Sequence, residues 1–478
     1  MDISFVKVID NINIVFTLIS CVCFILSLRG LSSIKTAKRG YQYAVLGIVL
    51  AIFPKIIEFN IFNSTFIIVL ITMGIASFIG YAIAKRIIMK DLPQLVAAFH
   101  SLIGLAALCI DSALLYSIHS TLQNNVTNVS VNVTNVSINV TNVSVIGSAI
   151  GAIIGAITFS GSIVAFCKLQ GIIKGKFNNL HLINILLFIS LITTFVLFTT
   201  TTNYYMFIAL VISALLLGYC FILPIGGADM PVIVSLLNSL SGWAAASLGF
   251  PNNNLLVIVG VLVGTSGAIL SYIMCKGMNR SLKEVLFTGF KNKIISTSNN
   301  KVQNNNAKTC AVEDASYLIY NANSVIIVPG YGMAVSQAQH ALKELVNKLL
   351  ANNITVKFAI HPVAGRMPGH MNVLLAEANI NDDYVFELDD INNEFGATDV
   401  VLVVGANDIT NPSAKDDPTS PIYGMPILEV WKSKTVIVIK RSLNSGYAGI
   451  DNPLFYKSNT LMLLGDAKKV IEQIVKSE

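Results

Sequence analysis

The sequence predicts a polytopic α-helical membrane bundle of about nine spans, followed by a C-terminal α/β domain of the doubly wound, Rossmann-like kind. Of the 478 residues, 54% are hydrophobic and only 12% are charged. That charged fraction is about half the value of an ordinary soluble domain. Charges are sparse in the first half of the chain and ordinary in density after about residue 310. These shifts divide the chain into a transmembrane domain at 1–290, a linker at 291–312 and a soluble domain at 313–478.

Nine apolar runs of spanning length support the prediction for the first half. They lie at Ile9–Ser27, Tyr43–Ile57, Thr65–Ala84, Leu92–Ser117, Val145–Phe166, Leu182–Thr199, Tyr204–Leu223, Met230–Phe250 and Leu255–Cys275. The second run is short, and Pro54 and Lys55 interrupt it. No cleavage site of small residues follows the first run, so a membrane helix is expected there and not a signal peptide.

Basic residues gather in every second loop between these runs. The clusters are Arg29, Lys35, Lys38 and Arg39; Lys85, Arg86 and Lys90; Lys168, Lys174 and Lys176; and Lys276, Arg280 and Lys283. Because basic loops face the cytoplasm, the N-terminus is expected outside and the soluble domain inside. The net charge of +6 therefore indicates membrane topology and not a nucleic-acid-binding surface.

The seven cysteines show no ligand spacing for zinc or for an iron–sulfur cluster, so no metal site is expected. All but Cys310 fall in or beside apolar runs. They are predicted to be reduced and to behave as small hydrophobic residues.

The segment from 125 to 145 is a low-complexity insert. It consists of three tandem copies, NVTNVSV, NVTNVSI and NVTNVSV, and each contains the Asn-x-Ser/Thr pattern that accepts glycans. An expanded external loop without a role is the favoured interpretation, because glycan acceptance matters only in a compartment that holds the transferase.

Polar residues at membrane depth need a reason, because burying them in lipid is costly. His100 is the only histidine well inside an apolar run, and Asp111 lies one helical stripe beyond it. Ser235, Asn238 and Gly242 share one face of the eighth run at helical spacing. These residues either make satisfied hydrogen bonds between helices or form a proton path, since a histidine titrates near neutrality.

Small residues at intervals of four predict close contacts between helices. Gly147, Gly151 and Gly155 form such a ridge in the fifth run, and Gly260 and Gly264 form another in the ninth. Both ridges are predictions of packing and carry no chemistry.

Beyond the linker, β-like and helical runs alternate, as in a parallel sheet with crossover helices. The expected strands are Ser324–Pro329, Thr355–Ile360, Asp383–Leu388, Val400–Val404, Thr435–Ile439 and Thr460–Leu464. The expected helices are Val335–Leu350, Asn372–Ala378, a weaker one at Asp390–Glu394, and one that starts at Asp466.

A dinucleotide-binding pattern follows the first strand. The residues Gly330, Tyr331, Gly332, Met333, Ala334 and Val335 form a GxGxxV string at a strand-to-helix turn. Such a string alone is weak evidence, but here it stands at the start of a βαβ unit. Glycines at these positions permit a tight turn and a close approach of backbone N–H groups to a pyrophosphate.

The ends of the second and fifth strands favour NADP over NAD. NAD-binding domains usually carry an acidic residue after the second strand for the ribose 2′-hydroxyl. This chain continues with His361–His370 instead. The fifth strand leads into Lys440, Arg441 and Ser442, which suit a 2′-phosphate. A solvated surface loop is the alternative interpretation of either basic site.

The fourth strand leads into Gly405, Ala406, Asn407 and Asp408. Its carboxyl end is expected beside the first glycine loop, at the topological switch point of the sheet. Topology therefore places Asp408 near a nucleotide, and capping a helix or loop is its alternative role. The long loop Asn411–Tyr423 has a length that is usually functional.

These motifs resemble the β subunit of the proton-translocating NAD(P) transhydrogenases. The resemblance rests on Gly330–Val335, His361–Gly369, Gly405–Asp408, Ile422–Trp431 and Lys440–Gly449, and in the membrane half on Gly226–Pro231, Leu237–Ser239 and Gly242–Trp243. It covers nearly the whole chain. The insert at 125–145, the short second run and the linker depart from it, and none of them touches a motif.

The resemblance implies hydride transfer from NADH to NADP⁺ while protons enter the cytoplasm. It implies NADP(H) on this chain and NAD(H) on a separate α subunit. The implied assembly is a dimer of α–β units in the lipid of a bacterial inner (plasma) membrane, with no nucleic acid.

The resemblance also implies roles for individual residues. The loop at 330–335 and Tyr447 would hold the nucleotide, with Gly369, Gly405 and Asn407 beside it. Arg366 would bind the phosphates, and Lys440, Arg441 and Ser442 the 2′-phosphate. His100 and Asn238 would line the proton path, and Asp408 would sit where nucleotide state and protonation are coupled.

Two other classes of protein share part of this organisation. An ion channel or transporter gated by a nucleotide-binding domain predicts regulation without turnover, and often an acidic residue after the second strand. A soluble-type reductase on a membrane anchor needs neither nine spans nor a membrane histidine.

Overall fold

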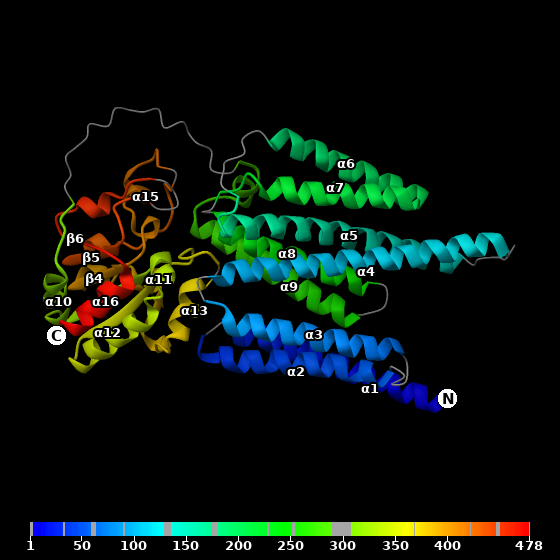
Figure 1. The fold of residues 1–478 in the computed structure, drawn as a ribbon, viewed down its shortest axis with the longest axis horizontal. Coiled ribbons are helices and arrows are strands. Elements are labelled where there is room, and N and C mark those ends of the chain that lie inside the picture. The colour runs from blue at the N-terminus through cyan, green and yellow to red at the C-terminus, as the bar shows by residue number, and fades with distance from the viewer. Residues whose placement is uncertain are drawn as a thin grey trace.

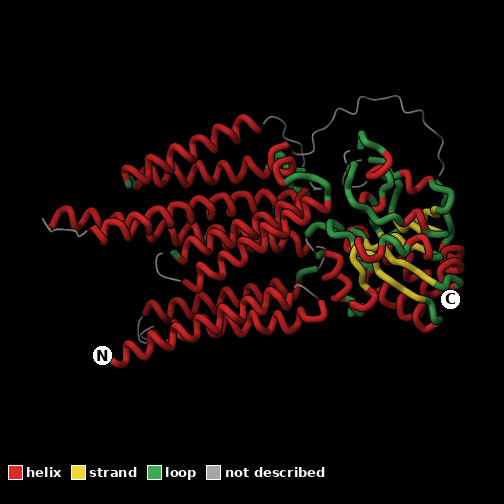
Figure 2. Tube along the Cα trace, turned by 180° about the vertical axis from the view of Figure 1, so that it is seen from behind, coloured by secondary structure: helices red, strands yellow, loops and turns green. Residues whose placement is uncertain are grey.

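A bundle of long helices and a smaller α/β domain make up the chain in the computed structural model (Figure 1). The structure describes residues 3–31, 34–58, 64–88, 91–128, 135–173, 180–226, 229–250, 254–288, 307–367, 369–420, 422–445 and 450–477. The α/β domain lies at one end of the bundle, and the view from behind shows the same arrangement (Figure 2).

Nine long helices form the bundle in the described part of the first half. They are α1 (Ile3–Leu31), α2 (Ile34–Glu58), α3 (Ser64–Arg86), α4 (Leu92–Asn128), α5 (Asn135–Leu169), α6 (Leu180–Thr201), α7 (Tyr204–Ile222), α8 (Met230–Gly249) and α9 (Asn254–Gly277). Each expected apolar run overlies one of them. Seven of the helices, α3 to α9, are long and apolar enough to cross a membrane, and α1 contributes a shorter apolar stretch at Ile14–Gly30.

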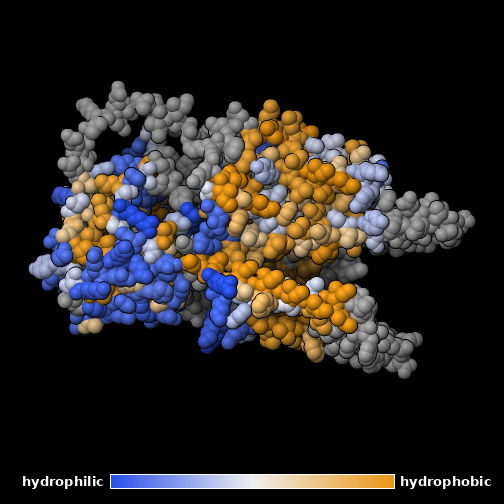
Figure 3. Space-filling view, in the orientation of Figure 1, coloured by the Kyte–Doolittle hydropathy of each residue, from blue (hydrophilic) through white to orange (hydrophobic). Residues whose placement is uncertain are grey.

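The outer surface of the bundle is apolar. Hydrophobic residues cover the helices in Figure 3, whereas hydrophilic residues gather on the α/β domain and at the end of the bundle beside it. Large apolar side chains such as Phe78 and Leu102 are 73% and 60% exposed. A helix that is hydrophobic on all sides is typical of a membrane span, where lipid takes the place of a protein core.

Glycines bring the inner helices of the bundle together, as the ridges predict, except at Gly147, where an added Cβ would lie at an ordinary 3.6 Å from Phe250 Cβ. A Cβ added to Gly155 would lie 2.9 Å from Leu108 N on α4. One added to Gly260 would lie 2.7 Å from Ala246 Cα on α8, and one added to Gly242 would lie 2.8 Å from Gly264 Cα on α9. Real Cβ atoms do not approach so closely, so these glycines are confirmed as points of close helix contact.

The insert at 125–145 differs from the expected loop. Helix α4 continues to Asn128, and α5 already begins at Asn135, so the described residues of the insert are helical. The physical reason is that a helix already nucleated in an adjoining span extends at little cost, even through residues of modest propensity.

All six expected strands are present in the α/β domain. They are β1 (Ser324–Pro329), β2 (Thr355–Ile360), β3 (Val385–Glu387), β4 (Val400–Val404), β5 (Thr435–Lys440) and β6 (Thr460–Leu464). They form one sheet in the order β3-β2-β1-β4-β5-β6, and every neighbouring pair is parallel. The order reverses between β1 and β4, as the sequence predicts.

The helices of this domain follow the expected alternation, with three differences. Those at Val312–Tyr320 and Ser413–Asp416 are not among the expected helices, the weaker one expected at Asp390–Glu394 lies at Leu388–Ile391, and the first expected helix is divided in two. The helices are α10 (Val312–Tyr320), α11 (Tyr331–Ser336), α12 (Gln339–Ala351), α13 (His370–Glu377), α14 (Leu388–Ile391), α15 (Ser413–Asp416) and α16 (Ala467–Lys476). The single helix expected at Val335–Leu350 is wrong, because Gln337 adopts the left-handed conformation with φ +54° and separates α11 from α12. Its N–H bonds back to Ala334 O, which closes the first helix.

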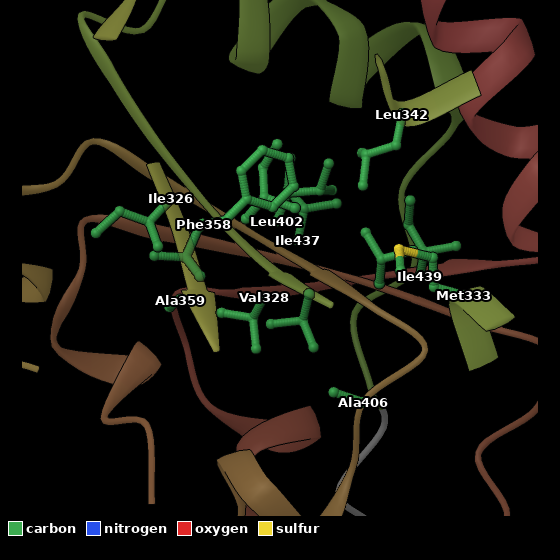
Figure 4. Close-up of a cluster of buried hydrophobic side chains, with 14 of the residues drawn as sticks. Ile326, Val328, Met333, Leu342, Phe358, Ala359, Leu402, Ala406, Ile437 and Ile439 are labelled. Carbon is green, nitrogen blue, oxygen red and sulfur yellow. The ribbon is translucent and has the colours of Figure 1, made fainter. Parts of the chain in front are cut away.

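The α/β domain has its own hydrophobic core. Figure 4 shows side chains of β1, β2, β4 and β5 gathered there, among them Phe358, Leu402 and Ile437. All five residues of β4 are buried, as expected for an inner strand of a parallel sheet whose two faces are covered. This core holds the carboxyl ends of β1, β2, β4 and β5 at one edge.

Candidate functional site

The glycine loops after β1 and β4 touch each other at the carboxyl edge of the sheet. Gly330 N donates to Val404 O at 2.9 Å, and Gly332 N donates to Gly405 O at 2.9 Å. The sheet order and these bonds confirm the predicted neighbourhood of the two loops. Asp408, which follows the second loop, therefore lies at the same edge as the GxGxxV string.

The structure shows why these positions require glycine, which the sequence alone did not reveal. A Cβ added to Gly330 would lie 2.5 Å from Gly405 O, and one added to Gly332 would lie 2.6 Å from Gly405 Cα. Gly405 itself has φ +65°, a conformation that favours glycine. Loop-to-loop packing alone thus requires glycine here.

The Arg366 side chain packs against the GxGxxV loop. Its Cζ lies 4.3 Å from the centroid of the Tyr331 ring, a cation–π geometry. The Arg366 main-chain N–H donates to His370 Nδ1 at 3.1 Å, and Gly365 and Gly369 adopt φ +105° and φ +65°. The segment after β2 is thereby folded back so that Arg366 and the β1 loop meet.

The same edge of the sheet faces the helical bundle. Arg366 Nη1 donates to Leu169 O, at the end of α5, at 3.2 Å. Asn279 Nδ2, just after α9, donates to Tyr423 O at 3.2 Å in the segment between β4 and β5. A Cβ added to Gly277 would lie 3.4 Å from Pro362 Cγ. Two helix ends of the bundle therefore contact the loops of the candidate nucleotide site.

Lys440 and Arg441 lie at the end of β5 with partners inside the domain. The Lys440 ammonium donates to Asn444 O and lies 4.8 Å from the centroid of the Phe455 ring. Burial lowers the pKa of Lys440, and the charges of Asp408 and Asp451 partly oppose that effect. Arg441 Nη2 pairs with Asp466 Oδ2 at 2.9 Å. Lys440 thus lies near Asp408, and Arg441 pairs with a residue that follows β6.

Ser442 and Tyr447 complete the residues that the sequence predicts around the nucleotide. Ser442 follows Arg441 and is half-buried. Tyr447 lies outside the described residues.

Asn452 holds the loop that carries Asp408, and sequence reasoning missed it. It is fully buried, and its Nδ2 donates to both Asn407 O and Asn407 Oδ1 at 3.1 Å. Asn407 Nδ2 in turn donates to Asp408 Oδ1 at 3.4 Å. The only signal for Asn452 in the sequence is an Asn-Pro pair, which predicts a turn and no more.

In the bundle, His100 meets Ser241 and not the predicted face of α8. Ser241 Oγ lies 3.3 Å from His100 Nδ1 and also donates to Asn238 O at 2.7 Å. Ser235 Oγ donates to Gly267 O at 3.1 Å, and the Asn238 amide lies beside Gly267, so that face turns toward α9. The link from His100 to Asn238 runs through the Ser241 hydroxyl to the Asn238 main chain.

A buried ion pair joins α8 and α9 at the end of the bundle beside the α/β domain. Arg280 Nη1 lies 2.5 Å from Asp229 Oδ1, with side chains 15% and 1% exposed. Nearby, Lys168 Nζ donates to Leu223 O and, at 2.6 Å, to Ile225 O. The helix ends that face the candidate nucleotide edge are therefore connected to one another.

The carboxyl edge of the sheet combines two glycine loops in contact with the cations of Arg366, Lys440 and Arg441. The order of the strands reverses at that point. Within the ranges that the structure describes, no group of three or more His, Cys, Asp or Glu side chains could hold a metal ion.

Comparison with known proteins agrees with this geometry. A family model described as "NAD(P) transhydrogenase beta subunit" matches residues 13–477. The chain is 49% identical over 465 residues to the NAD(P) transhydrogenase subunit beta of Rhodospirillum rubrum, covering 96% of this chain and 97% of that protein. A second sequence, from a named strain of that species, matches to the same extent. Nothing in these matches supports a nucleotide-gated channel. The chain belongs to the family of NAD(P) transhydrogenase beta subunits.

Proposed function

We propose that this chain and a separate α subunit form a proton-pumping transhydrogenase, which transfers hydride from NADH to NADP⁺ while protons cross the membrane into the cytoplasm. The observation that carries the proposal is the contact between Arg366 Nη1 and Leu169 O. It joins the candidate nucleotide edge of the α/β domain to the end of a helix that packs against α4, which bears His100.

The α/β domain is proposed to be Rossmann-like and to bind NADP(H). Its strand order is that of dinucleotide-binding domains. The loop at 330–335 would hold the pyrophosphate together with Arg366. Lys440, Arg441 and Ser442 would bind the 2′-phosphate, and Gly369, Gly405, Asn407 and Tyr447 would complete the site. When both nucleotides are bound, their nicotinamides supply the hydride chemistry between themselves, so no side-chain acid or base is needed at that step.

The proton path is proposed to run through the bundle past His100. This imidazole is 8% exposed and is held by Ser241. A histidine at membrane depth is a candidate proton carrier, because an imidazole can both take up and release a proton. Asn238 lies one turn of α8 before Ser241 and would line the path through the Ser241 hydroxyl.

Coupling is proposed to be a two-state change in how tightly the α/β domain holds its nucleotide. A change of charge at His100 would shift α4, α5 and α8. The shift would reach the domain through Leu169 and through the Asp229–Arg280 pair. Asp408 would respond to this shift because its carboxyl group accepts from Asn407 and its charge acts on Lys440. Differential affinity between two states is the only way in which binding can drive such an equilibrium.

The membrane arrangement completes the proposal. Nine spans would place the N-terminus outside and the α/β domain in the cytoplasm of a bacterial inner membrane, and the α–β unit would be a dimer. A cysteine introduced at Ser130 should then react with an impermeant reagent from outside intact cells. One at Lys457 should react only after the cells are opened. Labelling of both from the same side would refute the orientation.

The function is tested in vesicles that carry the chain with its α subunit, with the α/β domain facing the bath. NADPH with NAD⁺ should acidify the lumen, and NADH with NADP⁺ should make it more alkaline, because the proposed forward reaction moves protons toward the cytoplasmic face. Vesicles without the α subunit serve as the control. Hydride transfer with no change of luminal pH would refute proton coupling.

A further inference from the structure

Asp111 is a second titratable group inside the bundle, and the mechanism above does not use it. It lies in α4, within the span at Leu92–Ile118, and is 1% exposed. An 11-residue separation from His100 is three turns plus about 20°, so both lie on the same face of α4, roughly 16 Å apart along its axis. Asp111 lies on the side of His100 that faces away from the α/β domain.

The Asp111 carboxyl group lies between α4, α5 and α8. A Cβ added to Gly151 on α5 would lie 2.9 Å from Asp111 Cγ and would overlap both Asp111 Oδ2 and Ser247 Oγ of α8. Glycine at 151 therefore makes the space into which the carboxyl oxygen and the hydroxyl oxygen both point. Ser148, on the preceding turn of α5, is fully buried.

Few partners stabilise a negative charge at this point. The Ser148 hydroxyl is placed to stabilise the carboxylate. Within the part of the chain that the structure describes, Asp111 Oδ2 has no hydrogen-bond donor. The Ser247 hydroxyl donates to Ala244 O at 2.7 Å, so toward the carboxyl group it can only accept. A protonated carboxyl can donate to such an oxygen, whereas a carboxylate cannot.

Among the described side chains of α4, α5 and α8, no cation lies beside the group either. The described part of α8 carries no titratable side chain, and on α5 the titratable side chains are Cys167 and Lys168, at the opposite end of that helix. Among the described side chains of α4, the nearest titratable group that shares this face is His100. An ionised carboxylate without a cation beside it is costly at membrane depth, and residues that bear this cost are typically functional.

Thr158 and three closely packed glycines line the interface of α4 with α5 between His100 and Asp111. Thr158 on α5 is fully buried and faces Gly104, one turn beyond His100, since a Cβ added to Gly104 would lie 3.0 Å from Thr158 Cβ. Gly155 packs on the next turn against Leu108, and Gly151 on the next against Asp111. The interface of α4 with α5 thus carries polar groups at both ends and glycine backbone between them.

We propose that Asp111 is a second proton-carrying residue of the bundle, which takes protons from the outer face and passes them toward His100; this inference rests on the proposed proton-pumping function. In one transfer the carboxyl O–H bond breaks and the proton moves inward along hydroxyl groups and internal water. The carboxylate that remains then takes a proton from water on the outer side. One proton enters and one leaves, and the residue returns to its neutral form.

The test uses the full chain with its α subunit in vesicles, comparing wild type with Asp111→Asn and Asp111→Glu. Asn has the same shape but cannot titrate. Ser112→Ala is the matched control, since its hydroxyl bonds only within α4, to Leu108 O. Asp111→Asn should slow proton movement on the order of a hundredfold, as for loss of a positioned proton-transfer group. Asp111→Glu should restore movement with a shifted pH profile, and Ser112→Ala should behave as wild type.

A second readout does not depend on turnover. Infrared difference spectra of the purified chain, recorded across a pH series, should show a protonated-carboxyl band that titrates in wild type and is missing in Asp111→Asn. Wild-type proton movement and pH profile in Asp111→Asn, or a band unchanged by the substitution, would overturn the proposal. If Asp111→Asn does not fold, an unshifted band in Asp111→Glu would overturn the proposal instead. If wild type transfers hydride without moving protons, the proposed function fails, and the infrared titration still decides whether Asp111 titrates.

Discussion

The Arg366 guanidinium donates to the main-chain carbonyl of Leu169, at the end of α5, at 3.2 Å. The same group lies 4.3 Å from the Tyr331 ring centroid, in the GxGxxV loop. One side chain therefore contacts both a helix end of the membrane bundle and the loop proposed to hold a pyrophosphate. A ligand that draws Arg366 toward the loop competes with its bond to α5, and that competition is a direct physical route for coupling.

Replacing Arg366 with Lys should weaken both contacts. Lysine keeps the charge but loses the planar fork that can stack on Tyr331 and bond at the same time. NADP⁺ affinity of the full chain should fall roughly tenfold to a hundredfold, the size expected for a lost charge-assisted hydrogen bond. Titration calorimetry measures the change. Lys434→Ala, which removes an exposed cation paired with Asp399, should leave the affinity as it is. Equal losses in both variants would contradict the role of Arg366.

The preference for NADP⁺ over NAD⁺ should depend on Lys440 and Arg441. Replacing both with Ala should remove most of the preference, worth several kcal/mol if charge-assisted bonds form, while NAD⁺ affinity stays the same. Arg441 pairs with Asp466 at 2.9 Å in a largely exposed geometry. The Asp466→Asn variant removes that competing carboxylate and should bind NADP⁺ at least as tightly as wild type. Weaker binding in Asp466→Asn would show that the Arg441–Asp466 pair supports the site and does not compete with it.

The strands could be predicted from the sequence because each is a continuous apolar run, as buried parallel strands are. β1, β2, β4 and β6 have the expected bounds. The break of the helix at Gln337 could not be predicted, because a left-handed glutamine is imposed by tertiary packing and not by propensity. Tertiary packing also explains why glycine is needed at positions 330 and 332, where the two loops touch.

Within the bundle, periodicity placed Ser235, Asn238 and Gly242 on one face of α8, and the structure agrees that they share it. Periodicity does not predict which neighbouring helix packs against a given face. The glycines of α9 fit against that face, whereas Ser241 turns toward α4 and reaches His100. The partner of His100 was therefore missed, since only helix packing selects it.

The α/β domain should lose stability as the pH falls from about neutral toward 4. Burial lowers the pKa of His361 from 6.5 to about 4, opposed in part by its bond to Pro426 O. Its Nε2 lies 2.7 Å from that oxygen, and its Nδ1 accepts from Val363 N. Because Nδ1 accepts a hydrogen bond, the imidazole ring must be neutral in the folded state. Between the two pKa values the unfolded chain binds more protons than the folded one, so stability falls as pH falls, by up to about 3 kcal/mol.

Thermal unfolding of wild type and His361→Gln across that pH range measures the effect. Glutamine can still donate to Pro426 O but cannot be protonated, so its stability should depend less on pH. The His340→Ala variant, which removes an exposed histidine of α12, should keep the wild-type slope. Parallel curves for wild type and His361→Gln would mean that other groups cause the pH dependence.

The Asp229–Arg280 pair should matter most when only one partner is removed. Arg280→Gln leaves a nearly fully buried carboxylate without its cation, which should cost roughly 3–5 kcal/mol. The double variant Asp229→Asn with Arg280→Gln should lose less than the sum of the single losses. Unfolding in detergent gives the four values of this cycle. Strict additivity would show that the two side chains do not interact energetically.

The last prediction concerns His100. His100→Ala should abolish proton movement and both directions of hydride transfer together, because coupling leaves neither step able to proceed alone. NADP(H) affinity of the same variant should stay near wild type, since His100 lies in α4, outside the α/β domain. Ser241→Ala removes the hydroxyl 3.3 Å from His100 Nδ1 and should slow both activities without abolishing them, since the imidazole remains. The exposed His340→Ala again serves as the matched control. Vesicle assays measure luminal pH and nucleotide reduction in the same sample. If His100→Ala moved as many protons per hydride as wild type, His100 would be a packing residue, and the path would have to run elsewhere in the bundle.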